Sequence, residues 1–223
     1  MPEPKRSGSN GSVIVFIGRI RKKLVNMSWV RWLYSDRYLL LHAVEATEAV
    51  IADSDDGLYC NRVEDLALFE QTERWLPRDV FVAEARRRIA EGMCLYTAVT
   101  DGRLVHYGWL VPRQHEAWFP YVHQRFVFPE GSSVLFNAYT HPAARGTGLH
   151  LRSMRRRIAD ACASPGTVRV YTAIESHNRA SRAVAAKAGF KCVDVLFESV
   201  RFGRVNRGRM LPQAYFSRIE TQS

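Results

Sequence analysis

The sequence predicts an α/β fold in which helices cover the faces of a mixed β-sheet. Two observations predict it. Strand-like apolar runs alternate with helical patterns along most of the chain, and the composition is that of an ordinary globular protein, with 47% hydrophobic and 24% charged residues. This composition excludes a disordered chain. The 223 residues suit one large domain, which we assign to residues 36–223.

Residues 1–35 are predicted to form a separate N-terminal segment. It starts with a polar run, "MPEPKRSGSNG", which indicates a disordered leader over residues 1–11. Apolar residues then recur every three or four positions from Ile17 to Tyr34, with arginines and lysines between them. This pattern predicts a basic amphipathic helix over residues 17–34. Its apolar stripe packs on its own domain, packs on a second subunit of a homodimer, or lies on an anionic membrane surface.

Short strand-like and helix-like segments make up the first half of the domain. We expect strands over residues 37–44 and 57–63, followed by helices over 63–76 and 78–92. Residues 94–111 read as a β-hairpin whose turn is the pair Asp101 and Gly102.

The second half begins with a long aromatic connection over residues 112–131, for which core packing of an additional strand is the default explanation. Alternatively, it walls the pocket of a bulky or partly apolar substrate. We expect strands over 132–140 and 167–174, a strand pair over 190–205, and helices over 148–163 and 178–189. The predicted apolar face of the first of these helices consists of Leu151, Met154, Ile158 and Cys162.

The charge distribution favours an anionic partner. The net charge is +10, and residues 141–223 carry fifteen basic and five acidic residues. A phosphorylated cofactor, an acidic acyl carrier protein, an anionic membrane or a nucleic acid would each satisfy such a surface. Nucleic acid is the weakest of these candidate partners, because the arginines are scattered and form no recognised nucleic-acid-binding motif.

The cysteines and the apolar runs indicate the cellular compartment of the protein. The four cysteines are far apart and form no CxxC pair, which favours free thiols over disulfides or a metal site. Apolar runs are too short for a membrane span or an export signal. We therefore expect a cytoplasmic protein without a metal, with membrane contact through residues 17–34 as the alternative.

The stretch "THPAARGTGLH", residues 140–150, has the composition of an anion site. A strand ends near Tyr139 and a helix begins near Gly148. At such a junction, backbone N–H groups and the helix dipole converge, and glycines let phosphate oxygens approach. Arg145 would add a charge-assisted contact. Glycines at such a junction also serve simply to turn the chain.

A second motif follows this loop. In "NRASRAVAAKAGF", Asn178 opens a helix and a glycine ends it before the next strand. Together, residues 134–198 resemble the GCN5-related N-acetyltransferase (GNAT) superfamily, whose members bind acetyl-CoA. In its pyrophosphate-binding loop an Arg or Gln is followed by two variable residues, Gly, one variable residue, and Gly or Ala. The matching positions here are Arg145 and Gly148 in the loop, and Asn178, Lys187, Gly189 and Phe190 in the later motif.

The resemblance implies a mixed, mostly antiparallel central sheet flanked by helices, and acetyl-CoA or another acyl-CoA as co-substrate. The backbone near residues 136–140 would pair with the pantetheine arm. His150 departs from the family pattern, which prefers Gly or Ala, and it either points away from the cofactor or contacts a phosphate. The cofactor-binding residues that the resemblance implies are Thr140, Arg145, Gly146, Thr147, Gly148, Leu149, His150, Asn178, Ser181 and Lys187.

Acyl transfer to an amine needs a neutral nucleophile, donors for the developing oxyanion, and a proton for the leaving thiolate. The resemblance places the oxyanion contact on the backbone around Asn137 to Tyr139. Glu175 and His177 are the candidate bases, although Glu175 is equally suited to capping a helix and His177 to a solvated loop.

The proton donor is the part of this machinery that departs from the family. The resembling family commonly has a Tyr seven residues after the Asn, where this chain has Ala185. Tyr139, Tyr171, Ser181 or water would then supply the proton.

The sequence thus predicts an acyl-CoA-dependent N-acyltransferase that transfers acetyl from acetyl-CoA to an amine of a small molecule, such as an amino sugar or an aromatic amine. An acyl carrier protein is an alternative donor. Two other functions stay open: a catalytically weak or inactive CoA-binding regulatory module, and a basic nucleic-acid-binding protein.

Overall fold

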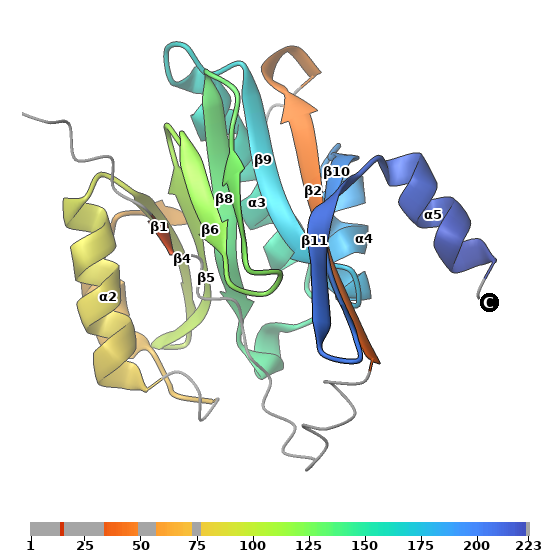
Figure 1. The fold of residues 1–223 in the computed structure, drawn as a ribbon. Helices are drawn as coiled ribbons and strands as arrows, with labels where there is room; N and C mark the ends of the chain where they lie inside the picture. The colour runs from red at the N-terminus through yellow and green to blue at the C-terminus, as the bar shows by residue number, and fades with distance from the viewer. Residues whose placement is uncertain (1–13, 16–33, 49–56, 73–76, 222–223) are drawn as a thin grey trace, which may run out of the picture.

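A computed structural model describes residues 14–15, 34–48, 57–72 and 77–221 (Figure 1). It confirms the mixed α/β fold, built on an eight-stranded sheet. All neighbouring strands in this sheet are antiparallel except β8 and β9, which are parallel. The strands, in the order in which they lie side by side, are β11 (Arg204–Met210), β10 (Lys191–Arg201), β2 (Tyr34–Glu45), β9 (Arg169–Glu175), β8 (Ser132–Thr140), β5 (Arg103–Val111), β4 (Cys94–Thr100) and β3 (Tyr59–Cys60).

A second, three-stranded sheet consists of β1 (Ile14–Val15), β6 (Glu116–Phe119) and β7 (Gln124–Val127). Its hairpin β6–β7 lies within the aromatic connection, so the expected additional strand is in fact a pair of strands. Phe119, Phe126 and Phe128 are buried in the core that this hairpin shares with the main sheet. Aromatic residues are common in such cores because each ring buries a large apolar area.

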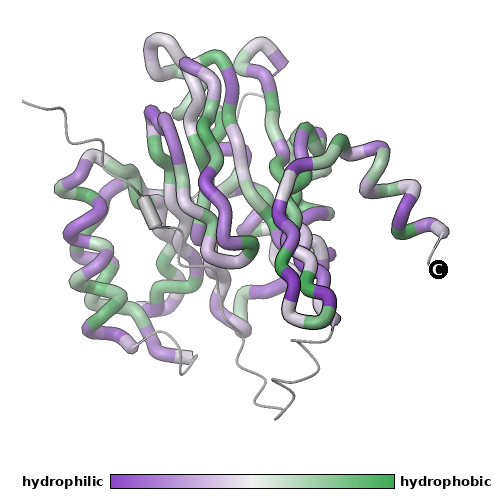
Figure 2. The backbone as a smooth tube through the Cα atoms, viewed as in Figure 1, coloured by the Kyte–Doolittle hydropathy of each residue, from purple (hydrophilic) through white to green (hydrophobic). Residues whose placement is uncertain are grey.

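Helices cover both faces of the main sheet. The α-helices are α2 (Arg78–Ala90), α3 (Leu149–Ala163), α4 (Arg179–Lys187) and α5 (Pro212–Glu220), and the 3-10 helices are η1 (Ala46–Glu48), η2 (Val63–Leu68) and η3 (Pro142–Ala144). In Figure 1, α2 and the β6–β7 hairpin lie on one side of the sheet, and α3 and α4 lie on the other. Figure 2 shows hydrophobic and hydrophilic residues alternating along these helices, as expected for helices with one buried face.

Two apolar clusters fill the space between these layers. The larger one joins α2, η2 and the β6–β7 hairpin to one face of the sheet, with Trp109, Phe136 and Tyr139 among its members. The other joins α3 and α4 to the opposite face, around Leu135 and Ile158. Neighbouring residues of β8 therefore belong to different clusters, because successive side chains of a strand point to opposite faces.

Two predicted elements are less than half as long as expected, and both lie before α2. Only residues 63–68 of the predicted helix over 63–76 are helical, as the 3-10 helix η2; residues 73–76 lie outside the described part of the chain. Phe69 leaves the helix in an extended conformation and packs on Phe81 of α2, with 4.2 Å between ring centroids. The predicted strand over 57–63 shrinks to β3, because Asn61 adopts a left-handed conformation (φ 54°).

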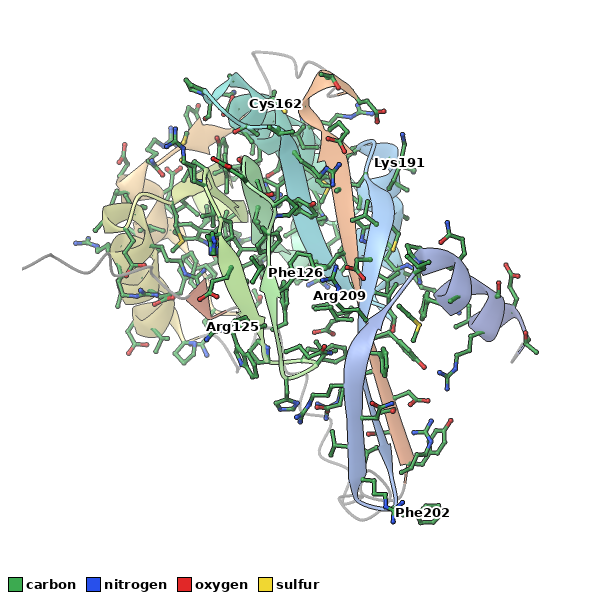
Figure 3. The ribbon with its side chains drawn as sticks, turned by 45° about the horizontal axis from the view of Figure 1, so that its top comes forward. Arg125, Phe126, Cys162, Lys191, Phe202 and Arg209 are labelled. Atoms are coloured by element: carbon green, nitrogen blue, oxygen red, sulfur yellow. The ribbon has the colours of Figure 1, made fainter. Side chains whose placement is uncertain are left out.

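The ends of the domain also differ from expectation. Tyr34 begins β2, so the predicted amphipathic helix does not include it; the rest of that helix and the predicted leader lie outside the described residues. Helix α5 was not predicted. It begins at Pro212 and packs through Tyr215 against Leu40 and Val195. Figure 3 shows it beside the β10–β11 hairpin, whose tip carries the exposed Phe202. No helix in the described ranges combines the length and apolar content required to cross a membrane.

Candidate active site

The parallel strands β8 and β9 separate part of the way along their length. They pair from Ser132 and Arg169 as far as Leu135 and Thr172. Beyond that point β8 continues to Thr140 and β9 to Glu175 without pairing to each other. The sheet is therefore forked, and the fork opens toward the N-terminus of α3, which follows β8 in the chain.

A β-bulge lies on β8 at the fork. Along β5 the register passes from Tyr107 opposite Tyr139 to Trp109 opposite Phe136, so two residues of β8 face Gly108 alone. One of these two, Asn137, has a left-handed backbone (φ 47°). A bulge disrupts the local ladder and redirects backbone groups, which is why bulges are common beside active sites.

The glycine loop lies at the open end of the fork. Gly146 and Gly148 have positive φ values of 86° and 79°, a conformation that side-chain-bearing residues rarely adopt. Gly148 is the N-cap of α3 and has no side chain to cover the first amides of the helix. The Arg145 side chain is exposed, and its Nε donates to the carbonyl of Thr140 at 3.3 Å. These residues form the short, basic strand-to-helix junction that an anion site requires.

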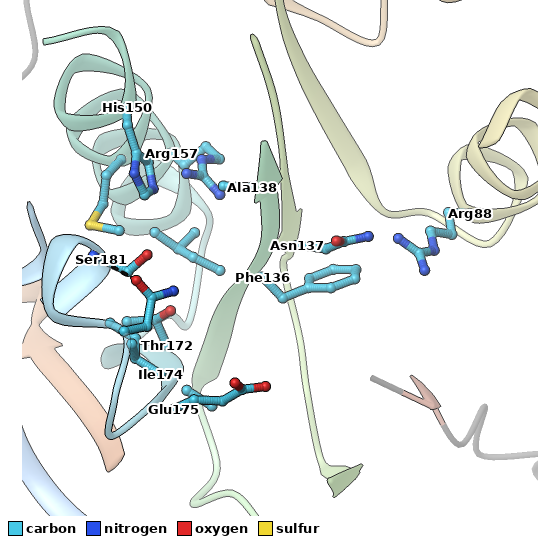
Figure 4. A pocket seen from close by; sticks show the side chains of 14 residues that line it. Arg88, Phe136, Asn137, Ala138, His150, Arg157, Thr172, Ile174, Glu175 and Ser181 are labelled. Atoms are coloured by element: carbon cyan, nitrogen blue, oxygen red, sulfur yellow. Dashed lines mark hydrogen bonds between the residues drawn. The ribbon is translucent and has the colours of Figure 1, made fainter. Parts of the chain in front are cut away.

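A pocket passes through the fork and joins the two faces of the sheet (Figure 4). On one side of β8 lie His150 and Arg157 of α3, and on the other lies Arg88 of α2. Among the predicted site residues, those that line the pocket are Asn137, His150, Glu175, Asn178 and Ser181.

The remaining predicted cofactor residues lie around the mouth of this pocket or apart from it. Thr140 Oγ1 lies 2.9 Å from His106 Nδ1, and Thr147 Oγ1 donates to the carbonyl of Ala144 at 2.9 Å. Leu149 is buried in a small cluster with Leu58. Lys187 ends α4, exposed, and does not line the pocket.

Asn178 and Ser181 connect the pocket to α4. Asn178 is the N-cap of the helix, and its Oδ1 accepts a hydrogen bond from the Ser181 backbone N–H at 3.1 Å. The cap fixes the first turn of α4 against the fork. Both side chains line the pocket, and this capping hydrogen bond fixes the backbone that carries them.

The two candidate bases lie together at the end of β9. The Glu175 carboxylate lies 3.2 Å from His177 Nε2, and its side chain is 21% exposed, against 68% for His177. Tyr121, in the turn of the β6–β7 hairpin, reaches the same place: its Oη lies 3.5 Å from His177 Nδ1. The hairpin therefore flanks the end of β9, where Glu175 lies, and the loop that carries His177. Of these two, only Glu175 lines the pocket.

The candidate acids are placed differently. Tyr139 does not line the pocket; its ring stacks on Tyr107 at 5.5 Å and its hydroxyl bonds to Thr72. Ala185, where the family commonly has Tyr, lies on the buried face of α4 and is fully buried. The Ser181 hydroxyl is the one group among the suggested side-chain donors that lines the pocket.

Two buried arginines of the pocket were missed by the sequence analysis. Arg88 is 4% exposed and Arg157 is 1% exposed. Burial lowers the pKa of both, that of Arg157 to about 10. In the sequence, Arg157 ends the run of arginines 155–157, and such a run suggests a solvated helix face. The spacing of Arg157 from Met154 and Ala161 could have indicated its burial, because these three positions share one helix face.

The buried face of α3 is accordingly shifted from the predicted one. Met154 and Ile158 are buried as expected, whereas Leu151 and Cys162 are only partly buried at its margin. The residues that complete the buried face are Leu149, Ser153, Arg157 and Ala161.

Comparison with known proteins identifies the class. The family model of the acetyltransferase (GNAT) domain matches residues 43–191, which is more than half of the chain. The chain therefore belongs to the GNAT acetyltransferase family, and the resemblance stated from the two motifs is confirmed. No curated protein matches the sequence.

Two solved structures with a TM-score of 0.50 agree with this fold. An acetyltransferase of the GNAT family from Novosphingobium aromaticivorans shares 19% identity at a TM-score of 0.50, over 73% of this chain and 63% of that one. A GNAT-family acetyltransferase from Colwellia psychrerythraea shares 17% identity at a TM-score of 0.50, over 71% and 53%. A ribosomal-protein-alanine N-acetyltransferase from Brucella melitensis shares 20% identity at a TM-score of 0.46, over 69% and 98%. This chain thus spans less than two thirds of the length of the first two structures.

Proposed function

We propose that this protein transfers the acyl group of an acyl-CoA, acetyl-CoA in the simplest case, to the amine of a small molecule. The observation that carries the proposal is the fork between β8 and β9, which opens onto the N-terminus of α3. A fork exposes strand edges to an extended ligand, and a helix N-terminus attracts phosphate. Acyl-CoA combines these two features, since it joins an amide-containing arm to a pyrophosphate.

The residues present fit such a ligand. The left-handed glycines at 146 and 148 would have nothing within 4 Å of an added Cβ, so the loop is open on that side. The exposed Arg145 adds positive charge at the same place. Asn178 and Ser181 provide polar side chains along the fork. The pyrophosphate would bind at residues 145–149 and the pantetheine arm along β8, toward the bulge at Asn137.

The acyl carbonyl would then lie at the bulge, where backbone N–H groups of β8 near Asn137 can donate to the oxyanion. We assign the base to Glu175, because its carboxylate lines the pocket and lies next to His177. Glu175 takes a proton from the incoming amine, directly or through one water. Ser181 or water returns a proton to the leaving thiolate.

The acceptor would approach from the face that carries α2 and the β6–β7 hairpin. Asn137, Phe136 and Glu175 extend toward that face in Figure 4. Tyr121 in the hairpin turn flanks the entrance. An amine with an apolar or aromatic body, such as an aromatic amine or an amino sugar, suits this mixture of rings and polar groups.

Release of free CoA thiol tests the proposal. Purified protein, acetyl-CoA and a panel of aromatic amines and amino sugars are mixed, and the thiol is measured by its reaction with a chromogenic disulfide. We expect at least one amine to raise thiol release well above the rate without amine, with an acetylated product of matching mass. No amine-dependent release from acetyl-CoA or other acyl-CoA donors would contradict the proposal.

The buried Ala185 favours a second candidate, a CoA-binding module with weak or no catalysis. It lacks the hydroxyl that protonates the thiolate in many relatives. This candidate predicts tight, saturable acetyl-CoA binding without amine-dependent thiol release. Binding and turnover measured on the same preparation therefore separate the two functions.

A further inference from the structure

Arg157 is the largest charged side chain that is completely buried in this protein's described residues. Its Nε donates to the carbonyl of Ser153 at 3.1 Å and its Nη1 to that of Trp109 at 3.1 Å. Its Nη2 is buried and has no hydrogen-bond partner among the described residues. Burying a donor without a partner is costly, so a ligand that satisfies Nη2 would gain the corresponding free energy.

No described residue compensates the charge of Arg157 either. Among the described residues, no carboxylate forms an ion pair with it, although the other arginine of the pocket, Arg88, pairs with Glu84 at 2.8 Å. With a pKa of about 10, lowered by burial, Arg157 stays protonated at neutral pH. An unpaired buried charge is rare in folded proteins because its desolvation is not repaid. The missing counter-ion is therefore expected to come from what binds in the pocket.

The fold gives Arg157 a definite place in the pocket. Because β8 and β9 are parallel and α3 connects them, α3 runs back along the fork in the opposite direction to both strands. His150 thus lines the pocket at its open end, and Arg157 lines it near the point where pairing begins. The Cα of Arg157 is roughly 13 Å along the helix axis from Gly148. Arg157 is therefore distant from the proposed pyrophosphate site.

Gly108 shows how closely the guanidinium approaches the bulge. A Cβ built on Gly108 would lie 2.7 Å from Cζ of Arg157. Gly108 is the residue of β5 that faces the bulge at Asn137 and Ala138. The guanidinium thus lies on the α3 side of the sheet, next to the bulge at which the proposed function places the acyl carbonyl.

We propose that the acyl group carried by this protein's donor ends in a carboxylate, as in malonyl-CoA or succinyl-CoA, and that Arg157 binds that carboxylate. This inference rests on the proposed function, because it takes the thioester to lie at the bulge. The amine nitrogen forms a bond to the thioester carbonyl carbon, the C–S bond breaks, the amine loses a proton to the base and the thiolate gains one. The terminal carboxylate passes unchanged into the amide product.

Calorimetric titration of the 223-residue chain tests the inference. The ligands are malonyl-CoA, succinyl-CoA, acetyl-CoA, and acetoacetyl-CoA, which has nearly the shape of malonyl-CoA without the charge. We expect one dicarboxylic ester to bind about ten- to a hundredfold more tightly than acetoacetyl-CoA. In Arg157→Met that preference should disappear, while the affinity for acetyl-CoA changes little.

Arg156→Met is the matched control, because Arg156 precedes Arg157 on α3 but pairs with Asp160. It should keep the preference. The melting temperature of each variant shows that it is folded. Equal binding of malonyl-, succinyl- and acetoacetyl-CoA would overturn the inference and leave the proposed function standing. The inference would also be overturned if Arg157→Met kept the preference for a dicarboxylic ester, or if it lost affinity equally for all four esters. Absence of binding by every ester would overturn both.

Discussion

At the end of β9, the Glu175 carboxylate both lines the pocket and lies 3.2 Å from His177 Nε2. Glu175→Gln keeps the size and removes the base. We expect kcat to fall about a hundredfold, with little change in the KM for acyl-CoA, because the side chain acts on the amine and not on the CoA. Steady-state thiol release with the accepted amine measures both constants.

His177→Gln is the comparison for this prediction. Its imidazole is more exposed and does not line the pocket, so we expect at most a small loss of kcat. Full activity in Glu175→Gln together with a large loss in His177→Gln would move the role of base to His177.

Cys60 is a second residue with a distinct chemical prediction. It is exposed on β3, and a hydrogen bond from the Cys94 thiol lowers the pKa of Cys60 to about 7, while the pKa of Cys94 is raised by the same contact. Since thiolate is the reactive form, alkylation of Cys60 by iodoacetamide should rise with pH around a midpoint near 7. Mass spectrometry of a pH series measures the midpoint. Cys94→Ala should raise it toward that of an ordinary thiol; an unchanged midpoint would contradict the assigned cause.

At the scale of elements, the contact between α3 and β5 depends on the absence of a side chain at Gly108. Gly108→Ala places a methyl group against the buried guanidinium of Arg157. We expect a loss of about 1–3 kcal/mol in the free energy of unfolding, measured by denaturant titration. In the Arg157→Met background the same change should cost distinctly less, since the flexible apolar side chain can move aside. Equal costs in both backgrounds would show that Arg157 is not the cause.

The elements that carry strong local signals were predicted well. Hairpin β4–β5 has its turn at Asp101 and Gly102, and α3 and α4 begin next to Gly148 and Asn178, as predicted. The failures are elements decided by tertiary contacts. Phe69 leaves the helical pattern to pack on Phe81, and α5 is a short helix whose apolar side depends on Leu40 and Val195. Local periodicity contains neither of these contacts.

At the scale of the whole molecule, the two motifs predicted the family, and several of the residues they suggested line one pocket. They did not predict the pocket that links the two faces of the sheet. Arg88 comes from a helix far outside both motifs, and Arg157 reads as part of a basic run until the backbone shows which face it occupies. Tyr139, by contrast, was predicted to belong to the site and does not line the pocket. It lies next to the bulge in sequence, but its side chain points into the core beside Thr72.

The central claim is that the fork between β8 and β9, with the glycine loop at its open end, binds acyl-CoA. Calorimetric titration of the wild-type protein and of Gly148→Val with acetyl-CoA tests it most directly. We predict saturable binding at one site per chain in the wild type. In the variant, binding should be at least about tenfold weaker, because the side chain is strained at φ 79° and blocks the loop. No heat of binding with acetyl-CoA or any other acyl-CoA, or equal affinity in a folded Gly148→Val variant, would contradict the account.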